Sequence, residues 1–440
     1  MGFAGRLRER LGGFWWHSLV IFCALRASDA LNAFAGVWLV PKYIDPAELG
    51  AVMPLTNFAV FLALPATVFA NTFRSELSRL ALAGDYGRMK SLMRGVFCAA
   101  GAFLAIALAA SRFVLPAFLG RIRIVEGSLG LLILLSAFLG AVHPVFNYSL
   151  QALKKFDANA AIGALGAPAR CIAMVVAMPF RAISGYFVGQ CATPAFNIAA
   201  TVFCLRKELS VPAERYWTRE VAKRFSRLAA LFAAAAFSGM AASLVESTVL
   251  RYNLPDLDSA GYYMASRFAE IATFATSTLT FTIFPYAAEL AAAGKRTDGL
   301  VLKAAAAAAA FGAAVATPFF FFGGDILALL PNGADYAPYG RFIPPLIGIG
   351  CMWSFACIYT TAEISAGRFG YLKWMVPLEL AYPAALLASG GPRSLHGMVC
   401  WMAAFNAAKA MFCAAAIFVE NRTSRKGKRK NGNQRIAADT

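Results

Sequence analysis

The stretch Tyr43-Ile-Asp-Pro-Ala-Glu-Leu-Gly50 leads into an apolar segment that ends at Arg74-Ser-Glu-Leu-Ser-Arg-Leu-Ala-Leu-Ala-Gly84. About 211 residues later, Pro255-Asp-Leu-Asp-Ser-Ala-Gly261 leads into a second apolar segment that ends at Pro285-Tyr-Ala-Ala-Glu-Leu-Ala-Ala-Ala-Gly294. The paired glycines are 34 residues apart in the first copy and 33 in the second. Two copies of one phrase indicate a duplicated bundle. The alternative is coincidence, since an acidic turn followed by an amphipathic helix end is a common pattern.

Apolar runs continue on both sides of this repeat, from about residue 15 to residue 420. A helix needs about 20 mainly apolar residues to cross the hydrocarbon core of a bilayer. With 59% hydrophobic and 15% charged residues, the chain is also too apolar for ordinary soluble domains. The expected fold class is therefore an all-α polytopic membrane protein with about twelve transmembrane helices. The predicted spans are 15–41, 50–73, 94–119, 127–152, 158–180, 183–205, 226–250, 261–287, 299–321, 338–364, 370–389 and 395–419.

Lysine and arginine fall into alternate gaps between these spans. If residue 1 is cytoplasmic, the cytoplasmic segments hold 29 of the 41 basic residues, the opposite side holds seven and the spans hold five. In short loops this bias sets the orientation, and it places both termini in the cytoplasm. The net charge of +18 is therefore mostly topological, and no nucleic-acid partner is expected, because such a partner requires basic residues gathered on one soluble face.

The repeat and the spans together predict the domain organisation. An N-terminal half of six helices (15–205) and a C-terminal half of six helices (226–420) are joined by a charged cytoplasmic linker (206–225). A short cytoplasmic N-terminus (1–14) precedes them, and a basic cytoplasmic tail (421–440) follows. An offset of six helices makes the two halves parallel, and transporters built in this way place their site in a central cavity between the halves.

Four stretches together carry a resemblance to a known family. They are the first copy of the repeated phrase, its end at Gly84-Asp85, Gln151-Ala-Leu-Lys-Lys-Phe156, and Ser259-Ala-Gly-Tyr-Tyr-Met-Ala-Ser-Arg267. The chain resembles the polysaccharide transporter, or O-antigen flippase, family of the multidrug/oligosaccharidyl-lipid/polysaccharide (MOP) exporter superfamily. The likeness extends over about residues 15–420, and its motifs are short patterns of acidic, glycine and arginine residues.

This resemblance implies a twelve-helix, MATE-like flippase of the bacterial inner membrane. Its substrate would be an undecaprenyl-diphosphate-linked oligosaccharide, an O-antigen or exopolysaccharide repeat unit, moved between the leaflets by alternating access. Membrane lipids and the polysaccharide polymerase machinery are the implied partners. Related flippases for the lipid-linked peptidoglycan precursor usually have two more helices, which this chain lacks.

Five ionisable residues inside the predicted spans are candidates for function. An ionisable side chain at mid-bilayer costs about 2.5–3.5 kcal/mol on insertion scales, so those present usually face a cavity or a partner. Arg26 and Asp29 lie at i,i+3 in the first span, Arg267 and Glu270 at i,i+3 in the eighth, and Glu246 in the seventh. At that spacing two side chains share one helix face and can pair. The resemblance implies that the first, second, seventh and eighth helices line the cavity.

The arginines are the candidates for substrate binding. A planar guanidinium gives bidentate hydrogen bonds to phosphate oxygens, so Arg26 and Arg267 are predicted to hold the diphosphate. Arg74, at the cytoplasmic end of the second span, is a third candidate. The alternative is that each arginine only neutralises a carboxylate and fixes helix packing. A structural role of this kind is also expected for Arg170 and Lys409.

The carboxylates are the candidates for energy coupling. Asp29, Glu246 and Glu270 could bind a proton or a sodium ion, because burial favours protonation of a carboxylate near neutral pH. No cofactor is expected beyond such an ion. The cysteines show no CxxC spacing and the histidines have no ligand-spaced partner, so no metal site is predicted.

Several enzyme classes are excluded or disfavoured. The chain has no GxxxxGK[ST] phosphate loop, no HExxH and no GxSxG motif, so a transporter is favoured over an enzyme. Asp256-Leu-Asp258 has the DxD form of metal-dependent glycosyltransferases, but acidic residues also favour the start of a helix. The alternatives left open are a multidrug or other lipid-linked precursor exporter of the same superfamily, and a polytopic membrane glycosyltransferase or polymerase.

Overall fold

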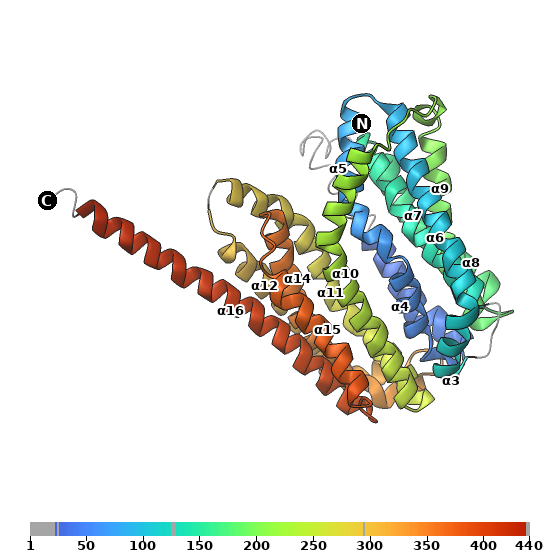
Figure 1. Cartoon of the computed structure of the whole chain (residues 1–440). Helices are drawn as coiled ribbons and strands as arrows, with labels where there is room; N and C mark the ends of the chain where they lie inside the picture. Colours follow the sequence, from blue (N-terminus) through green and yellow to red (C-terminus); the bar gives the residue numbers. More distant parts are fainter. Residues whose placement is uncertain (1–22, 24–25, 125–128, 294, 437–440) are drawn as a thin grey trace, which may run out of the picture. The chain divides into compact units, whose positions relative to one another are not determined.

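The chain is helical throughout the part that the computed structural model describes, which comprises residues 23, 26–124, 129–293 and 295–436 (Figure 1). The first helix is described from residue 26 and continues through a π-helical segment. The predicted N-terminal segment 1–14 lies outside the described residues. The elements that follow residues 26–34 are η1 (Ala35–Leu39), α2 (Val40–Tyr43), α3 (Pro46–Leu49), α4 (Val52–Leu62), α5 (Leu64–Leu82), α6 (Tyr86–Arg121), α7 (Leu129–Ala152), α8 (Phe156–Ala177), α9 (Ala182–Cys204), η2 (Glu208–Ser210), α10 (Arg219–Asn253), α11 (Asp256–Ala292), α12 (Asp298–Ala328), α13 (Gly333–Tyr336), η3 (Ala337–Phe342), α14 (Ile343–Ser365), α15 (Leu372–Ala388) and α16 (Leu395–Ile436).

Eight of the described helices are long and apolar enough to cross a membrane: α6, α7, α8, α9, α10, α12, α14 with the turns before it, and α16. The other four predicted spans correspond to the first helix, to α4 with α5, to α11 and to α15. The first helix lies partly outside the described residues. The other three fall short as single apolar spans for local reasons: the break at Ala63 divides α4 from α5, threonines and charged residues lower the mean hydropathy of α11, and α15 has only 17 residues. The prediction of an all-α polytopic membrane protein is confirmed.

The helices begin where polar side chains can cap them. Asp45 accepts a hydrogen bond from the backbone N–H of Ala47 (2.9 Å) and starts α3 just before Pro46. Asp85 caps α6 in the same way, and the Thr218 hydroxyl accepts from Val221 N–H (3.3 Å) at the start of α10. Such caps satisfy backbone donors that a helix leaves without an internal partner. The start of α10 at Arg219 lies inside the predicted linker.

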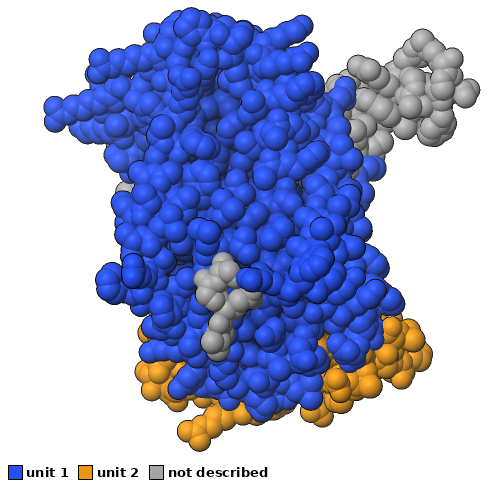
Figure 2. All heavy atoms as spheres, turned by 90° about the vertical axis from the view of Figure 1, so that its right-hand side faces the viewer, with its two compact units in different colours: residues 1–263, 330–332 blue, residues 264–329, 333–440 orange. Residues whose placement is uncertain are grey.

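The chain divides into two compact units, which Figure 2 colours separately. Unit 1 comprises Met1–Tyr263 with Leu330–Asn332, and unit 2 comprises Met264–Leu329 with Gly333–Thr440. Unit 1 therefore includes all of α10 and the first two turns of α11, because α10 packs on α4 and α5. The predicted halves, 15–205 and 226–420, divide the chain elsewhere, and the duplication remains a prediction.

Within unit 1, α6 to α9 pack as neighbours (Figure 1), and α5 and α4 pack on α7. Within unit 2, α12 packs on α14, and α14 packs on α16. The alanine run that begins at Ala304 contributes to the unit 2 core, where Ala304 and Ala308 are buried beside Ile358 and Cys413. Small side chains let helices approach closely where no hydrophobic effect drives them together.

The two copies of the repeated phrase meet inside unit 1. Gly50 ends the first copy and lies against Ser259 of the second, so that a Cβ atom at position 50 would lie 2.4 Å from Ser259 Cβ. We expect Gly50→Ala to lower the free energy of unfolding by about 1–3 kcal/mol, because the two backbones must move apart. Thermal unfolding in detergent checks this. Gly101→Ala, at a helical glycine with open space around it, is the control and should be neutral or stabilising; equal effects of the two changes would contradict the expectation.

Candidate functional site

The predicted pairing of Arg26 with Asp29 is present in the first helix. Arg26 Nη2 lies 3.1 Å from Asp29 Oδ2, at i,i+3. The side chains are 27% and 36% exposed. The guanidinium is therefore neutralised within its own helix and is still partly accessible.

Arg267 and Glu270 repeat this arrangement in α11. Arg267 Nη2 lies 2.8 Å from Glu270 Oε1, and the side chains are 26% and 44% exposed. Both residues lie in unit 2, whereas Arg26 and Asp29 lie in unit 1. The two predicted arginine–carboxylate pairs thus lie one in each unit, each on one face of a single helix. The assignment of substrate binding to these arginines remains a prediction.

A second polar group in unit 1 connects the first helix to its neighbours through Arg170. Arg170 Nη1 donates to Asn32 Oδ1 (3.1 Å), one turn beyond Asp29. The same guanidinium lies over the Tyr186 ring, 5.7 Å from its centroid, and the Tyr186 hydroxyl lies 3.2 Å from Thr56 Oγ1. Arg170 of α8 therefore joins the first helix to α9, and Tyr186 joins α9 to α4, which agrees with the structural role expected for this arginine.

Glu246 is partly buried on α10, beside a polar contact with α4. Asn57 Nδ2 donates to the backbone oxygen of Ser243 (3.1 Å) and to Ser247 Oγ (3.0 Å). These serines lie within one turn of Glu246 on either side. Glu246 therefore lies on α10 next in sequence to a residue that contacts α4, and its role as a coupling residue remains a prediction.

Arg74, the third predicted substrate ligand, is exposed on α5. Its guanidinium lies over the Tyr148 ring of α7, 4.5 Å from the centroid. This cation–π contact holds the Arg74 guanidinium near the ends of α5 and α7. The chain between α9 and α10 lies at the same ends of these helices. Its role in binding remains a prediction.

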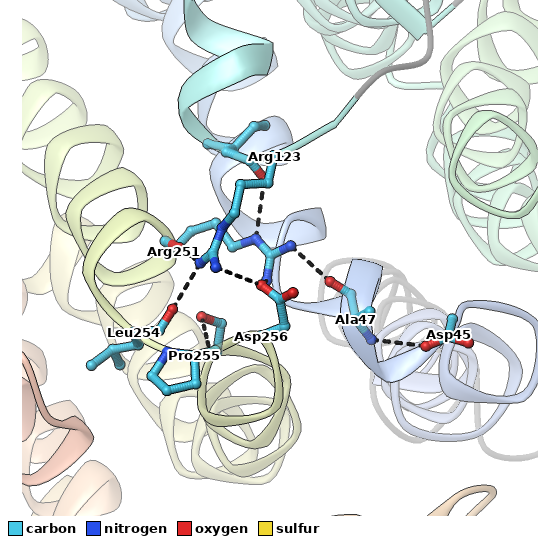
Figure 3. Close-up of polar contacts among 9 residues, drawn as sticks. Asp45, Ala47, Arg123, Arg251, Leu254, Pro255 and Asp256 are labelled. Carbon is cyan, nitrogen blue, oxygen red and sulfur yellow. Dashed lines mark hydrogen bonds and ion pairs between the residues drawn. The ribbon is translucent and has the colours of Figure 1, made fainter.

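Sequence reasoning missed a buried arginine that contacts several helices. We call Arg123, Arg251 and Asp256 the arginine clasp (Figure 3). Arg251 is 1% exposed; its Nη2 donates to Ala47 O (2.7 Å) and its Nε to Ile122 O (3.2 Å). Its Nη1 forms an ion pair with Asp256 Oδ1 at 2.8 Å. One side chain therefore joins the end of α10 to α3, to the end of α6 and to the start of α11.

Arg123 completes the clasp from the chain after α6. Its Nη1 forms an ion pair with Asp256 Oδ1 at 3.0 Å, and its Nη2 donates to the backbone oxygens of Arg251 and Leu254. The backbone of Arg123 has a φ of 61°, a conformation that non-glycine residues seldom adopt. Such strained residues cluster at functional sites, where the surrounding structure holds them in place.

The clasp also bears on the Asp256-Leu-Asp258 motif. The Asp256 carboxylate begins α11 and is shared by two guanidinium groups, so its charge is already compensated. This favours the interpretation of these residues as helix-start residues over a glycosyltransferase metal ligand. A sequence signal was present, since Arg251 and Asp256 lie on either side of the turn between two long predicted helices.

Unit 2 also contains a deeply buried ion pair between Lys409 and Glu379. Lys409 Nζ of α16 lies 2.7 Å from Glu379 Oε1 of α15, and the side chains are 8% and 11% exposed. The ammonium also lies over the Phe405 ring, 5.1 Å from its centroid. Lys409 therefore pairs at a helix interface, as the structural interpretation of this residue predicts.

Metal-ligating groups do not gather in the described part of the chain, where no three His, Cys, Asp or Glu side chains are placed to hold an ion. His143 lies in the middle of α7, not at a helix end, and its Nε2 is 2.9 Å from Asn147 Nδ2 and 3.0 Å from Asn197 Nδ2. It is satisfied by amide groups of α7 and α9.

Comparison with known proteins shows what this arrangement of helices resembles. No protein-family model matches the chain, and no curated protein matches it by sequence. Solved structures do match. An inward-facing multidrug resistance transporter of the MATE family, in the MOP superfamily, aligns with a TM-score of 0.61 and 13% identity over 93% of this chain and 96% of that one.

Two other solved structures also match the chain. The lipid II flippase MurJ, in an inward closed conformation, aligns with a TM-score of 0.64 and 12% identity over 91% of this chain and 87% of its own. A MOP superfamily transporter from Pyrococcus furiosus, described as having a binding pocket of reversed polarity, aligns with a TM-score of 0.56 and 14% identity over 92% and 94% of the two chains. The chain therefore has the MOP transporter fold, and the predicted MATE-like architecture is confirmed.

Proposed function

We propose that the chain is a flippase that moves a polyprenyl-diphosphate-linked oligosaccharide, such as an undecaprenyl-diphosphate-linked O-antigen or exopolysaccharide repeat unit, between the leaflets of the bacterial inner membrane. Two facts support this proposal. The fold is that of transporters, among them a flippase for a lipid-linked precursor. The residues placed inside the spans include cations that suit phosphate. A polysaccharide polymerase is the expected partner in the membrane.

The observation that carries the proposal is the pair of partly exposed arginines, Arg26 and Arg267, each held by a carboxylate one turn away. A diphosphate can replace the carboxylate as the bidentate partner of each guanidinium. The released carboxylates of Asp29 and Glu270 would then carry unpaired negative charge inside the membrane, which favours binding of a proton or sodium ion. Substrate binding and ion binding are thereby coupled through the same two pairs, and Glu246 is the third candidate for the ion.

Alternating access requires one end of the helices to close while the other opens. The arginine clasp lies at the end of α10 opposite to its start at Arg219, and it fastens that end of unit 1. The positive-inside rule assigns the start of α10 and the basic residues near it to the cytoplasm, with both termini on the same side. In the proposed cycle the clasp therefore holds the non-cytoplasmic ends of α3, α6, α10 and α11 together. Its hydrogen bonds and ion pairs must break when the substrate leaves on that side.

A second candidate function is multidrug export, which the MATE structures favour because they match over nearly their full length. The two functions differ in what the arginines do. A diphosphate substrate needs the guanidinium groups, whereas a cationic drug would be repelled by them. The same arginine variants therefore discriminate between the two functions.

Leaflet translocation in proteoliposomes tests the proposal. A fluorescent polyprenyl-diphosphate oligosaccharide is reconstituted with the chain, and its movement is followed by loss of accessibility to a membrane-impermeant quencher. We expect Arg26→Ala and Arg267→Ala each to reduce transport by about tenfold or more, since a charge-assisted hydrogen bond is worth about 1.5–3 kcal/mol.

Arg112→Ala is the matched control, because Arg112 also lies inside a long apolar helix but is exposed on α6 and has no predicted role. Transport in this variant should equal that of the unchanged chain. Arg26→Lys should recover only part of the transport, because lysine keeps the charge and loses the fork. Undiminished transport in both alanine variants, or efflux of a cationic dye without lipid transport, would overturn the proposal.

A further inference from the structure

Unit 1 contains an apolar cavity of about 300 Å³, which lies between α5, α6, α7 and the start of α10. Aromatic rings form much of its wall, with Phe69 and Phe73 from α5, Phe103 from α6 and Phe138 from α7. Small side chains of α6 form another part, including Ala99. Among the residues that the structure describes, no charged side chain lines it. A sugar or another polar ligand would find few hydrogen-bond partners here, whereas a hydrocarbon chain requires none.

The chain between α9 and α10 closes one end of this cavity. We call residues 206–218 the linker strap. Three contacts fasten it to the ends of α5 and α6. The Tyr216 hydroxyl donates to Glu76 Oε2 (3.0 Å), the Glu214 N–H donates to Gly87 O (3.1 Å), and Lys90 Nζ donates to Val211 O (2.9 Å). The strap also begins with a fixed contact, since Glu208 pairs with Lys155 at 2.7 Å. Partial burial would raise the pKa of Glu208, but the hydrogen bond and charge of Lys155 outweigh it and lower that pKa.

Trp217 of the linker strap forms the lid over this end. Its indole lies so close to Gly95 that an ideal Cβ atom at position 95 would fall 1.9 Å from the indole nitrogen. Any side chain at position 95 would clash with the indole, so the close contact of Trp217 with α6 requires glycine there. Within the described part of the chain, the buried indole N–H has no hydrogen-bond partner. Because this nitrogen is buried and lies against the α6 backbone at Gly95, the indole covers the end of the cavity without offering a hydrogen bond to a ligand.

Positive charge gathers at the same end of α6. Arg88, Lys90 and Arg94 lie in its first turns, directly before Gly95 and Ala99 of the cavity wall. Arg94 is exposed, and no hydrogen bond or ion pair of its side chain is found among the described residues. Arg88 pairs with Asp85 and Lys90 donates to Val211 O, so Arg94 is the cation of these three that stays available beside the cavity. An apolar cavity next to such a cation is complementary to a molecule with a hydrocarbon chain and an anionic head.

We propose that this cavity binds the polyisoprenoid chain of a lipid diphosphate, with the diphosphate near Arg94. The inference rests on the proposed function, since the lipid is the carrier of the proposed substrate. At about 300 Å³ the cavity is at the lower limit of ligand pockets, so it holds a segment of the chain while the rest stays in the bilayer. Binding here would position the carrier before its headgroup reaches Arg26 and Arg267.

Photo-crosslinking tests this site without requiring transport. The probe is a sugar-free polyprenyl diphosphate with a diazirine in its hydrocarbon chain, added to the full chain in nanodiscs and mapped by mass spectrometry of the labelled peptides. We expect labelling of α6 and α7 segments that include Phe103 and Phe138. Unlabelled polyprenyl diphosphate should compete with the probe, whereas an equal amount of phosphatidylglycerol should not.

The matched variants are Ala99→Trp, which fills the cavity, and Ala105→Trp, which places the same ring on the same helix at an exposed position that does not line the cavity. We expect Ala99→Trp to reduce labelling by about tenfold, because several methylenes lose their contacts, and Ala105→Trp to leave it unchanged. Ala99→Leu fills less of the cavity and should give an intermediate loss of labelling. This variant keeps the test informative if the tryptophan variant fails to fold.

Two outcomes would overturn the site: labelling that is insensitive to Ala99→Trp, and equal competition by phosphatidylglycerol, which would make the cavity a site for bulk lipid. The outcome for the proposed function is separate. Transport of the oligosaccharide lipid with labelling elsewhere refutes the site alone. Labelling at the site by a chain that does not transport the lipid refutes the proposed function and leaves the site standing.

Discussion

Replacing Arg251 with alanine is expected to lower the free energy of unfolding by about 3–5 kcal/mol and to loosen the clasped end of unit 1. Arg251 is among the largest fully buried side chains of the described residues. Its removal leaves the carbonyl groups of Ala47 and Ile122 without their charged donor and opens a cavity where α3, α6 and α10 meet. Both effects act together because a single side chain makes all these contacts.

The measurement is equilibrium unfolding in detergent micelles, followed by circular dichroism. Arg251→Lys should fall between the alanine variant and the unchanged chain, since an ammonium can keep the ion pair to Asp256 but cannot reach both carbonyl groups. Arg121→Ala is the control, because Arg121 is exposed at the end of α6, two residues before Arg123. A loss for Arg251→Ala no larger than that for Arg121→Ala would show that the clasp does not stabilise the fold.

The spans and the two arginine–carboxylate pairs could be predicted because they depend on local sequence. A span is a run of apolar residues, and the pairs Arg26–Asp29 and Arg267–Glu270 follow from the i,i+3 geometry of one helix. Neither requires knowledge of which helices are neighbours. The helix ends were predicted less well, since α10 begins inside the predicted linker and α6 begins eight residues before its predicted span.

The clasp could not be predicted in the same way, because its partners lie far apart in the sequence. Arg251 contacts the backbone of Ala47, 204 residues away, and of Ile122, 129 residues away. An arginine at a predicted helix end is expected to face water or lipid headgroups. From the sequence, Arg251 therefore counts as one of the loop charges that set the orientation, and no partner is assigned to it. The packing of α10 on α4 and α5 within unit 1 turns this residue inward.

The same packing brings the two copies of the repeated phrase into contact. Ala47 and Gly50 belong to its first copy, and Asp256 and Ser259 belong to its second. Arg251 bonds to Ala47 and Asp256, and Gly50 contacts Ser259. The clasp therefore lies where the starts of α3 and α11 meet, a position at which a small relative movement would open both contacts. The duplication of the two segments remains a prediction.

Replacing Lys409 with methionine is expected to lower the free energy of unfolding by about 3–5 kcal/mol, because Glu379 would lose its cation inside the membrane. The two side chains are among the least exposed charged groups of unit 2, and their atoms are 2.7 Å apart. Removing both charges should be far less harmful, since two apolar side chains of similar size can replace a buried ion pair at little cost. The double variant Lys409→Met with Glu379→Leu is therefore expected to recover most of the lost stability.

Unfolding of the single and double variants in detergent, with Lys373→Met on the exposed side of α15 as the control, separates two roles of this pair. A purely structural pair gives a double variant that is stable and still transports the lipid substrate. A pair that carries the coupling ion gives a double variant that is stable and does not transport. If the double variant is as unstable as Lys409→Met alone, the loss arises from packing around α15 and α16, and the uncompensated charge of Glu379 is not its cause.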